Sequence, residues 1–335
     1  MTEVNISPGS VSQKADIEAA RHPRVEQFKE TFRMLLRNKG GLVGMIIVIL
    51  FYLIAILDAV YPAYLGVAHD VTLSNFIPKS ATGPGGAYSF IPPYSPGFSH
   101  GWGYILGGGT WNIPLLATML AAMKFDLGYS TLIVGLGALI GVTLGTVSAY
   151  LGGILDEIMM RITDIFFSVP FIVLAVAITA ILGHNYNALV YALIIIWWPI
   201  YARLSRSLAL QTKSLNYIEA ARAAGSSKVR NIFVHIIPNV LSPAFVQVSL
   251  DIGTIILIFA TLDFLGVLYI NAFLGPPELG LLITLGVGGG GAPDYLMTGQ
   301  WWIFLFPGLM LLLFTVSANL FGDGLRDVLD PKLRR

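Results

Sequence analysis

The chain has 335 residues, of which 55% are hydrophobic and only 12% are charged, and its formal net charge is +1. Soluble domains carry about 25% charged residues, so the composition excludes an ordinary soluble domain and indicates an integral membrane protein. A charge this close to zero gives no sign of nucleic-acid binding, and the absence of cysteine excludes disulfides and iron–sulfur clusters.

Six stretches are long and apolar enough to cross a bilayer, because a helix needs about 20 residues to span about 30 Å of hydrocarbon. The alternating ten-residue pattern of a membrane β-barrel is not found. The predicted fold class is therefore an all-α membrane protein with six transmembrane helices. The predicted spans are 40–57, 127–155, 165–183, 185–202, 238–262 and 295–322.

Lys and Arg are distributed unevenly between the two sides of these spans. Eighteen of the 20 fall in residues 1–39, in the 153–164 turn, in the loop between the fourth and fifth spans, or after Gly322. Only Lys79 and Lys124 fall between the first two spans. Because cytoplasmic connections carry an excess of Lys and Arg, both termini and the central loop are predicted to be cytoplasmic.

Four segments follow from this topology. Residues 1–39 predict a cytoplasmic arm that ends in a helix on the membrane surface, rather than a cleaved signal peptide. The first span is assigned to 40–60. Residues 61–126 are rich in Gly, Pro and aromatic side chains and nearly lack charge, which indicates an extracytoplasmic insert with irregular structure. A five-helix core follows at 127–322, and a cytoplasmic tail, after a helix stop at Gly322 and Gly324, at 323–335.

Small residues and proline mark the second and third spans. Gly137, Gly141 and Gly145 recur at four-residue intervals, and a row of glycines lets another helix approach closely. The row fits packing within this chain, and it also fits a face for a partner subunit. Pro170 predicts a kink in the third span. The charged residues at 156–164 are expected to cap and anchor helices.

The most informative stretch is the loop at 205–238, called the coupling loop below. Tyr217 to Ala224 predicts a short helix of small residues, and Gly225 followed by two serines is typical of a helix end and a new N-cap. Pro238 suits the first turn of the next helix. The alanines would let another backbone come close, which favours contact with a partner protein. The alternative is an amphipathic connector that lies on the membrane surface.

Two acidic residues fall at membrane depth in the fifth span. Ionisable groups there are costly and usually face a cavity or a partner, so Asp251 and Asp263 are candidates for the translocation pathway. They are 12 residues apart, about 120° around a helix, and need not share a face. For Asp251, a buried pairing role is an equally good interpretation.

The coupling loop contains Glu219-Ala220-Ala221, then Gly225, and then His235-Ile-Ile-Pro238. This pattern resembles the EAA loop of the inner-membrane subunits of ABC importers, and the His235 ending resembles the dipeptide/oligopeptide branch. Leu-Leu-Arg-Asn-Lys at 35–39 and the ending from Trp301 to Pro331 resemble the same branch. The resemblance covers about 28–60 and 127–335, and it implies the transmembrane domain of a type I ABC importer, as a C-type permease subunit.

In that family the helix of this loop docks into a cleft on a cytoplasmic ATPase. The resemblance therefore implies ATPase-coupling roles for the following residues: Tyr217, Glu219, Ala220, Ala221, Arg222, Gly225, His235 and Pro238. It also implies a second homologous permease subunit, two ATP-binding subunits, an extracytoplasmic substrate-binding protein and a location in the cytoplasmic membrane.

The implied function is ATP-driven import of di- or oligopeptides. No phosphate-binding loop and no catalytic or metal-binding motif occurs in the sequence, so we expect no enzyme activity, cofactor or metal in this chain and ATP hydrolysis in the partners. Relatives that carry oligosaccharides or nickel complexes leave those substrates as alternatives. An ion-coupled secondary transporter is a further alternative, but it would need broken helices in internal repeats, and the sequence has no clear repeat.

Overall fold

The computed structural model describes residues 33–60, 93–101, 104–109, 114–267, 276–289, 292 and 294–329. The surface helix predicted before residue 39, the insert up to residue 92 and the end of the tail lie largely or wholly outside these residues. The main helices are α3 (Lys39–Val60), α5 (Leu115–Leu151), α6 (Gly153–Ser168), α7 (Phe171–Leu182), α8 (Tyr186–Lys213), α9 (Asn216–Ala223), α10 (Lys228–Arg230), α11 (Ile237–Phe264), α12 (Leu279–Gly286) and α13 (Trp302–Leu329).

In the described part of the chain, five helices are long and apolar enough to cross a membrane, and α6 and α7 together would make a sixth. The prediction of six spans is therefore confirmed in number. The kink predicted at Pro170 in the third span, 165–183, is confirmed in position, and it is a full break, because α6 and α7 meet there at 94°. Pro170 stands at the break and caps α7, since its ring nitrogen has no hydrogen to donate to a continuous helix.

Two predicted boundaries are corrected. The second span begins at Leu115 rather than Leu127, so Lys124 and Asp126 lie in a helix and not in the irregular insert. The last helix continues to Leu329 and does not stop at Gly322 or Gly324. A Cβ atom at Gly324 would collide with the backbone of Gly41 on α3, so this glycine permits close helix contact rather than ending the helix.

The glycine row of α5 packs against α8. Gly141 and Gly145 face the backbone of Trp198 and Ala202, where no side chain would fit, and Ser205 Oγ donates a hydrogen bond to the Gly141 carbonyl at 3.2 Å. Packing within this chain, one of the two interpretations of the row, is therefore confirmed.

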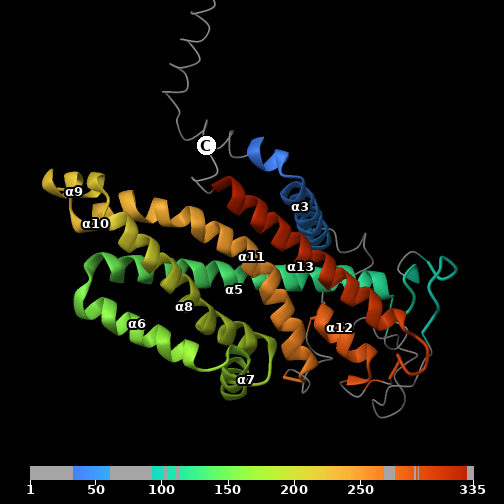
Figure 1. Ribbon diagram of the computed structural model, residues 1–335. Coiled ribbons are helices and arrows are strands. Elements are labelled where there is room, and N and C mark those ends of the chain that lie inside the picture. The colour runs from blue at the N-terminus through green and yellow to red at the C-terminus, as the bar shows by residue number, and fades with distance from the viewer. Residues whose placement is uncertain are drawn as a thin grey trace, which may run out of the picture.

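Two buried apolar clusters hold the helices together. One lies between α3, α5, α11, α12 and α13, and the other lies between α5, α7, α8 and α11 and includes Ile218 of α9. Figure 1 shows α9 and α10 at one end of the long helices and α12 at the opposite end. Because α5 and α11 run between these ends, they connect the coupling loop to the region around α12.

Candidate functional site

The short helix predicted in the coupling loop is present as α9. Gly225, with φ +83°, comes just after its C-terminal end, and the Ser227 side chain caps the next helix, α10, by accepting a hydrogen bond from the backbone N–H of Arg230 at 3.3 Å. Ile218 is the fully buried residue of α9, while Glu219, Ala220 and Arg222 are exposed. The helix is thus held by the Ile218 side chain, with Ala221 half-buried, and offers most of its remaining surface to solvent.

Three predicted coupling residues lie around the start of α11. The Asn239 amide donates to Tyr217 Oη at 3.1 Å and to the His235 carbonyl at 2.6 Å. The Tyr217 and His235 rings meet edge to face with centroids 6.4 Å apart. Pro238 lies in the first turn of α11 and is exposed, after a π-helical turn at Asn231–Ile236. The structure therefore brings Tyr217 and His235 together, and links α9 to a membrane-length helix.

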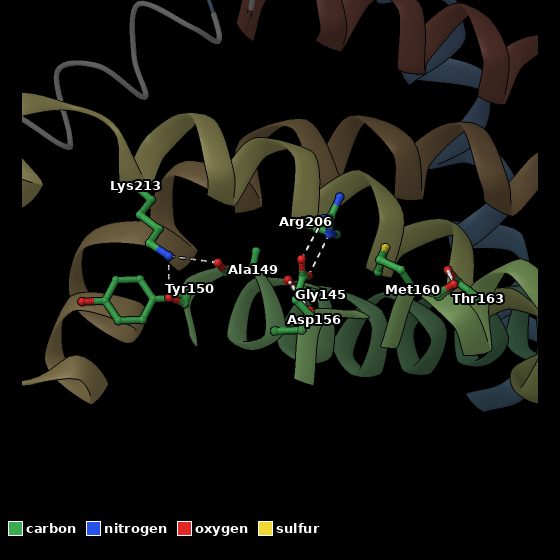
Figure 2. A network of polar contacts seen from close by, with 9 residues as sticks. Gly145, Ala149, Tyr150, Asp156, Met160, Thr163, Arg206 and Lys213 are labelled. Carbon is green, nitrogen blue, oxygen red and sulfur yellow. Dashed lines mark hydrogen bonds and ion pairs between the residues drawn. The ribbon is translucent and has the colours of Figure 1, made fainter. Parts of the chain in front are cut away.

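The base of the coupling loop is bonded to the end of α5. Lys213 Nζ donates to the carbonyls of Ala149 at 3.3 Å and Tyr150 at 2.8 Å, and so satisfies carbonyls that the helix end leaves free (Figure 2). The Asn231 amide donates to Tyr150 Oη at 3.0 Å. A movement of α9 and its flanking turns would therefore be transmitted to α5 as well as to α11.

Ion pairs connect α8 to α6. Arg206 binds Asp156 through two hydrogen bonds, at 2.8 and 2.7 Å, and the pair is partly buried (Figure 2). Arg203 pairs with Asp164 at 2.6 Å in a more exposed position. The prediction that the charged residues at 156–164 anchor helices is confirmed for these two aspartates.

Asp251 is buried and held by two donors. Trp197 Nε1 of α8 donates to Asp251 Oδ2 at 3.0 Å, and Gln247 Nε2 donates to Oδ1 at 2.8 Å. Both carboxylate oxygens are thus engaged within this chain, which favours the pairing interpretation over an open pathway position. Its pathway role stays a prediction.

Asp263 belongs to a group of buried acids, called the carboxyl cluster below and formed by Asp126, Asp263 and Glu278. The Glu278 side chain is within hydrogen-bonding reach of Asp263, and the backbone N–H of Leu279 donates to Asp126 Oδ2 at 3.2 Å. Each of the three acids is at most 3% exposed. Among the described residues, no group of His, Asp and Glu meets the requirements of a metal site, so the cluster does not form one.

Asp126 and Glu278 are not predicted as site residues from the sequence pattern. Asp126 was assigned to the irregular insert, and Glu278 follows two prolines in a segment with no helical pattern. The signal that could have identified them is their position at the edge of an apolar stretch, because an acidic side chain there is energetically costly unless it has a partner.

The sequence matches the family described as the inner membrane component of binding-protein-dependent transport systems over residues 139–335. Residues 26–75 match the N-terminal transmembrane domain of oligopeptide transport permease C.

Two curated relatives and one solved structure extend these matches. The probable D,D-dipeptide transport system permease protein DdpC of Escherichia coli is 39% identical over 65% of this chain and 70% of its own length. The dipeptide transport system permease protein DppC of Haemophilus influenzae is 32% identical over 89% of this chain and 92% of its own. A chain of the MetNI methionine ABC transporter, in an inward-facing conformation, superposes with a TM-score of 0.47 at 22% identity, covering 64% of this chain and 98% of that one.

The family match covers more than half of the chain, and its helices are those of a multi-pass protein of the inner membrane. The chain therefore belongs to the family of inner-membrane components of binding-protein-dependent transport systems.

Proposed function

We propose that this chain is a permease subunit of an ATP-driven ABC importer for di- or oligopeptides. The curated relatives named above are dipeptide or D,D-dipeptide transport permeases. Peptides are accordingly favoured over the oligosaccharides and nickel complexes that the sequence left as alternatives.

The observation that carries the proposed coupling role is the exposure of α9. A helix whose one fully buried side chain is Ile218, with small and charged residues facing outward, has the surface of an element that a partner holds. In the proposed complex the partner is a cytoplasmic ATPase, and a second homologous permease subunit and an extracytoplasmic binding protein complete the importer. This arrangement requires the coupling loop and both termini to be cytoplasmic, as the Lys and Arg distribution predicts.

The proposed mechanism is a shift between two conformations. ATP-driven closure of the ATPases would displace α9, and Asn239 and Lys213 would pass the displacement to α11 and α5. The bundle would then move between inward-open and outward-open states, with the ATPases supplying the free energy. No bond to the substrate is made or broken in this chain.

The test is uptake of a labelled dipeptide by proteoliposomes that contain both permeases, both ATPases and the binding protein. Glu219→Lys reverses a charge on the exposed face of α9, and Gly225→Val forces a side chain into a left-handed backbone conformation with open space around it. Each is expected to lower ATP-driven uptake at least tenfold while the membrane helices stay folded. Glu157→Lys, an exposed charge reversal on α6, is the matched control and should retain uptake within about twofold.

Normal uptake by both α9 variants would contradict the coupling role. Uptake that persists without ATP or without the ATPase subunits would instead indicate an ion-coupled carrier. Competition by unlabelled peptides, oligosaccharides and nickel complexes separates the possible substrates.

A further inference from the structure

A polar pocket lies between α9 and the end of α5. Its volume is about 380 Å³, and it is lined by Tyr150, Leu151, Lys213, Arg222, Ser226 and Lys228. Three of these six residues are cationic and none is acidic. The nearby carboxylate of Asp156 is neutralised by its two hydrogen bonds to Arg206 and does not line the pocket.

The cations of the pocket differ in how they are held. Lys213 is fixed by the carbonyls of Ala149 and Tyr150, and its Nζ lies 5.5 Å from the centre of the Tyr150 ring. The side chains of Arg222 and Lys228 have no ion pair with any acid in the described part of the chain. One fixed and two uncommitted positive charges therefore face a single cavity.

Ser226 provides an independent sign of a missing ligand. Its Oγ is buried and has no hydrogen-bond partner among the described residues, although Ser226 lines the pocket. Leaving a buried hydroxyl without a partner is unfavourable, and a hydroxyl can donate to an anionic oxygen. The hydroxyl and the three cations together form a set of convergent donors.

We propose that this pocket binds a phosphate group, supplied either by the headgroup of an anionic phospholipid or by a free phosphate anion. A tetrahedral phosphate presents oxygens in several directions at once, so it can meet donors from α8, α9, α10 and the turn between α9 and α10, which a planar carboxylate could not do equally well. The pocket lies where the ends of α5 and α8 meet the coupling loop, which is the depth of lipid headgroups for membrane helices. The bound phosphate would hold the coupling loop against α5, whether or not α9 docks on an ATPase.

The test uses the full-length chain, purified and delipidated in detergent. The ATPase subunits are left out because their nucleotide sites would bind phosphate themselves. Inorganic phosphate and dihexanoyl phosphatidylglycerol are titrated separately by calorimetry. At least one probe is expected to bind with one site per chain. Lys228→Gln should weaken that binding about fivefold or more, and Ser226→Ala about threefold, because each removes a donor to a charged group.

Arg230→Gln is the matched control. It removes the same charge from an exposed residue two positions beyond Lys228, outside the pocket lining, and should change the affinity by less than about twofold. Binding of phosphatidylglycerol alone identifies a lipid headgroup, and binding of inorganic phosphate identifies a soluble anion. The proposal is overturned if neither probe binds at millimolar concentration, or if Arg230→Gln weakens binding as much as Lys228→Gln. If Lys228→Gln does not fold, Ser226→Ala against Arg230→Gln decides in the same way.

Discussion

The two ends of α5 and α11 differ in how they hold acidic side chains. At the end that carries the coupling loop, charges are exposed or paired with groups of opposite sign, as Arg206 is with Asp156. At the other end, the three acidic side chains of the carboxyl cluster lie close together and are buried. The first arrangement suits a surface that a partner must reach, and the second suits a tightly closed contact between α5, α11 and the segment before α12.

The packing of α5 against α8 keeps both ends in one body, and its loss should have the largest effect. Gly141→Val would place side-chain atoms against the carbonyl of Trp198 and the backbone of Ala202. Overpacking of this kind costs typically about 1–3 kcal/mol, and contact with backbone puts this site at the upper end of that range. We expect a large loss of folded, monodisperse protein and a lower midpoint of thermal unfolding in detergent.

Gly135→Val provides the comparison for this variant. Gly135 is on the same helix, but a Cβ there would meet nothing within 4 Å. Its unfolding midpoint should stay close to that of the wild type. Equal losses for the two variants would show that helix propensity, and not the α5–α8 contact, causes the effect.

Arg206→Met tests the end with paired charges. The substitution keeps a similar apolar length but leaves Asp156, which is only 14% exposed at its side chain, without its partner. Leaving a partly buried carboxylate unpaired should lower the free energy of unfolding by about 1–3 kcal/mol, measured by thermal or denaturant unfolding. Arg161→Met, which removes an exposed partner 3.8 Å from Glu157, should cost less than about 0.5 kcal/mol. Similar costs for both variants would contradict the assigned difference in burial.

Glu278→Gln tests the end with buried acids. Burial, and then the charge of Asp263, raise the pKa of Glu278 well above its ordinary value of 4.5. The protonated form is therefore the one that the folded state favours. Its contribution to stability is complete below pH 4.5 and is lost as the pH rises through the raised folded value.

Gln keeps the donor to Asp263 without the ability to ionise. We therefore expect the variant to lose less stability between pH 5 and 8, with a midpoint of unfolding about 2–4 °C above the wild type at pH 8, which corresponds to about 1 kcal/mol. The groups that face Glu278 are Asp263, Asp126 and the hydroxyls of Tyr129 and Tyr186, none of which supplies a compensating positive charge. Glu157→Gln, at an exposed glutamate, should leave the pH dependence of stability unchanged. If Glu278→Gln and the wild type show the same dependence of the unfolding midpoint on pH, the raised pKa assigned to Glu278 is contradicted.

The two ends also differ in how well the sequence predicts them. The boundaries of α9, predicted at Tyr217 to Ala224, are correct to within one residue. The glycine that follows α9 and the serine N-cap of α10 were predictable because each depends only on its neighbours in the sequence. The carboxyl cluster was predicted only in part, through Asp263. Asp126 and Glu278 come from separate segments of the chain, and no local sequence pattern predicts that these segments will be in contact.

Glycine and proline were ambiguous for a similar reason. Gly324 resembles a helix stop, but its contact with Gly41 depends on how α3 and α13 cross. Pro170 predicted the position of a bend, while the 94° angle depends on what surrounds α6 and α7. The same residue type therefore ends a helix at Gly225 and joins two helices at Gly324, and only the tertiary contact distinguishes them.

The smallest effect is expected where a single exposed hydrogen bond links α9 to α11. Tyr217→Phe removes the hydroxyl that accepts from Asn239 but keeps the ring that packs against His235. Because the site is exposed, water can replace the bond, and the free energy of unfolding should fall by no more than about 1 kcal/mol. If α9 transmits movement through this link, however, the rate of ATP-driven dipeptide uptake should fall further than stability does, and Tyr217→Ala, which also removes the ring contact, should lower it more. A fall in uptake for Tyr217→Ala no greater than for Tyr217→Phe would show that the ring contact does not transmit the movement, and would leave the buried Ile218 as the connection between α9 and the bundle.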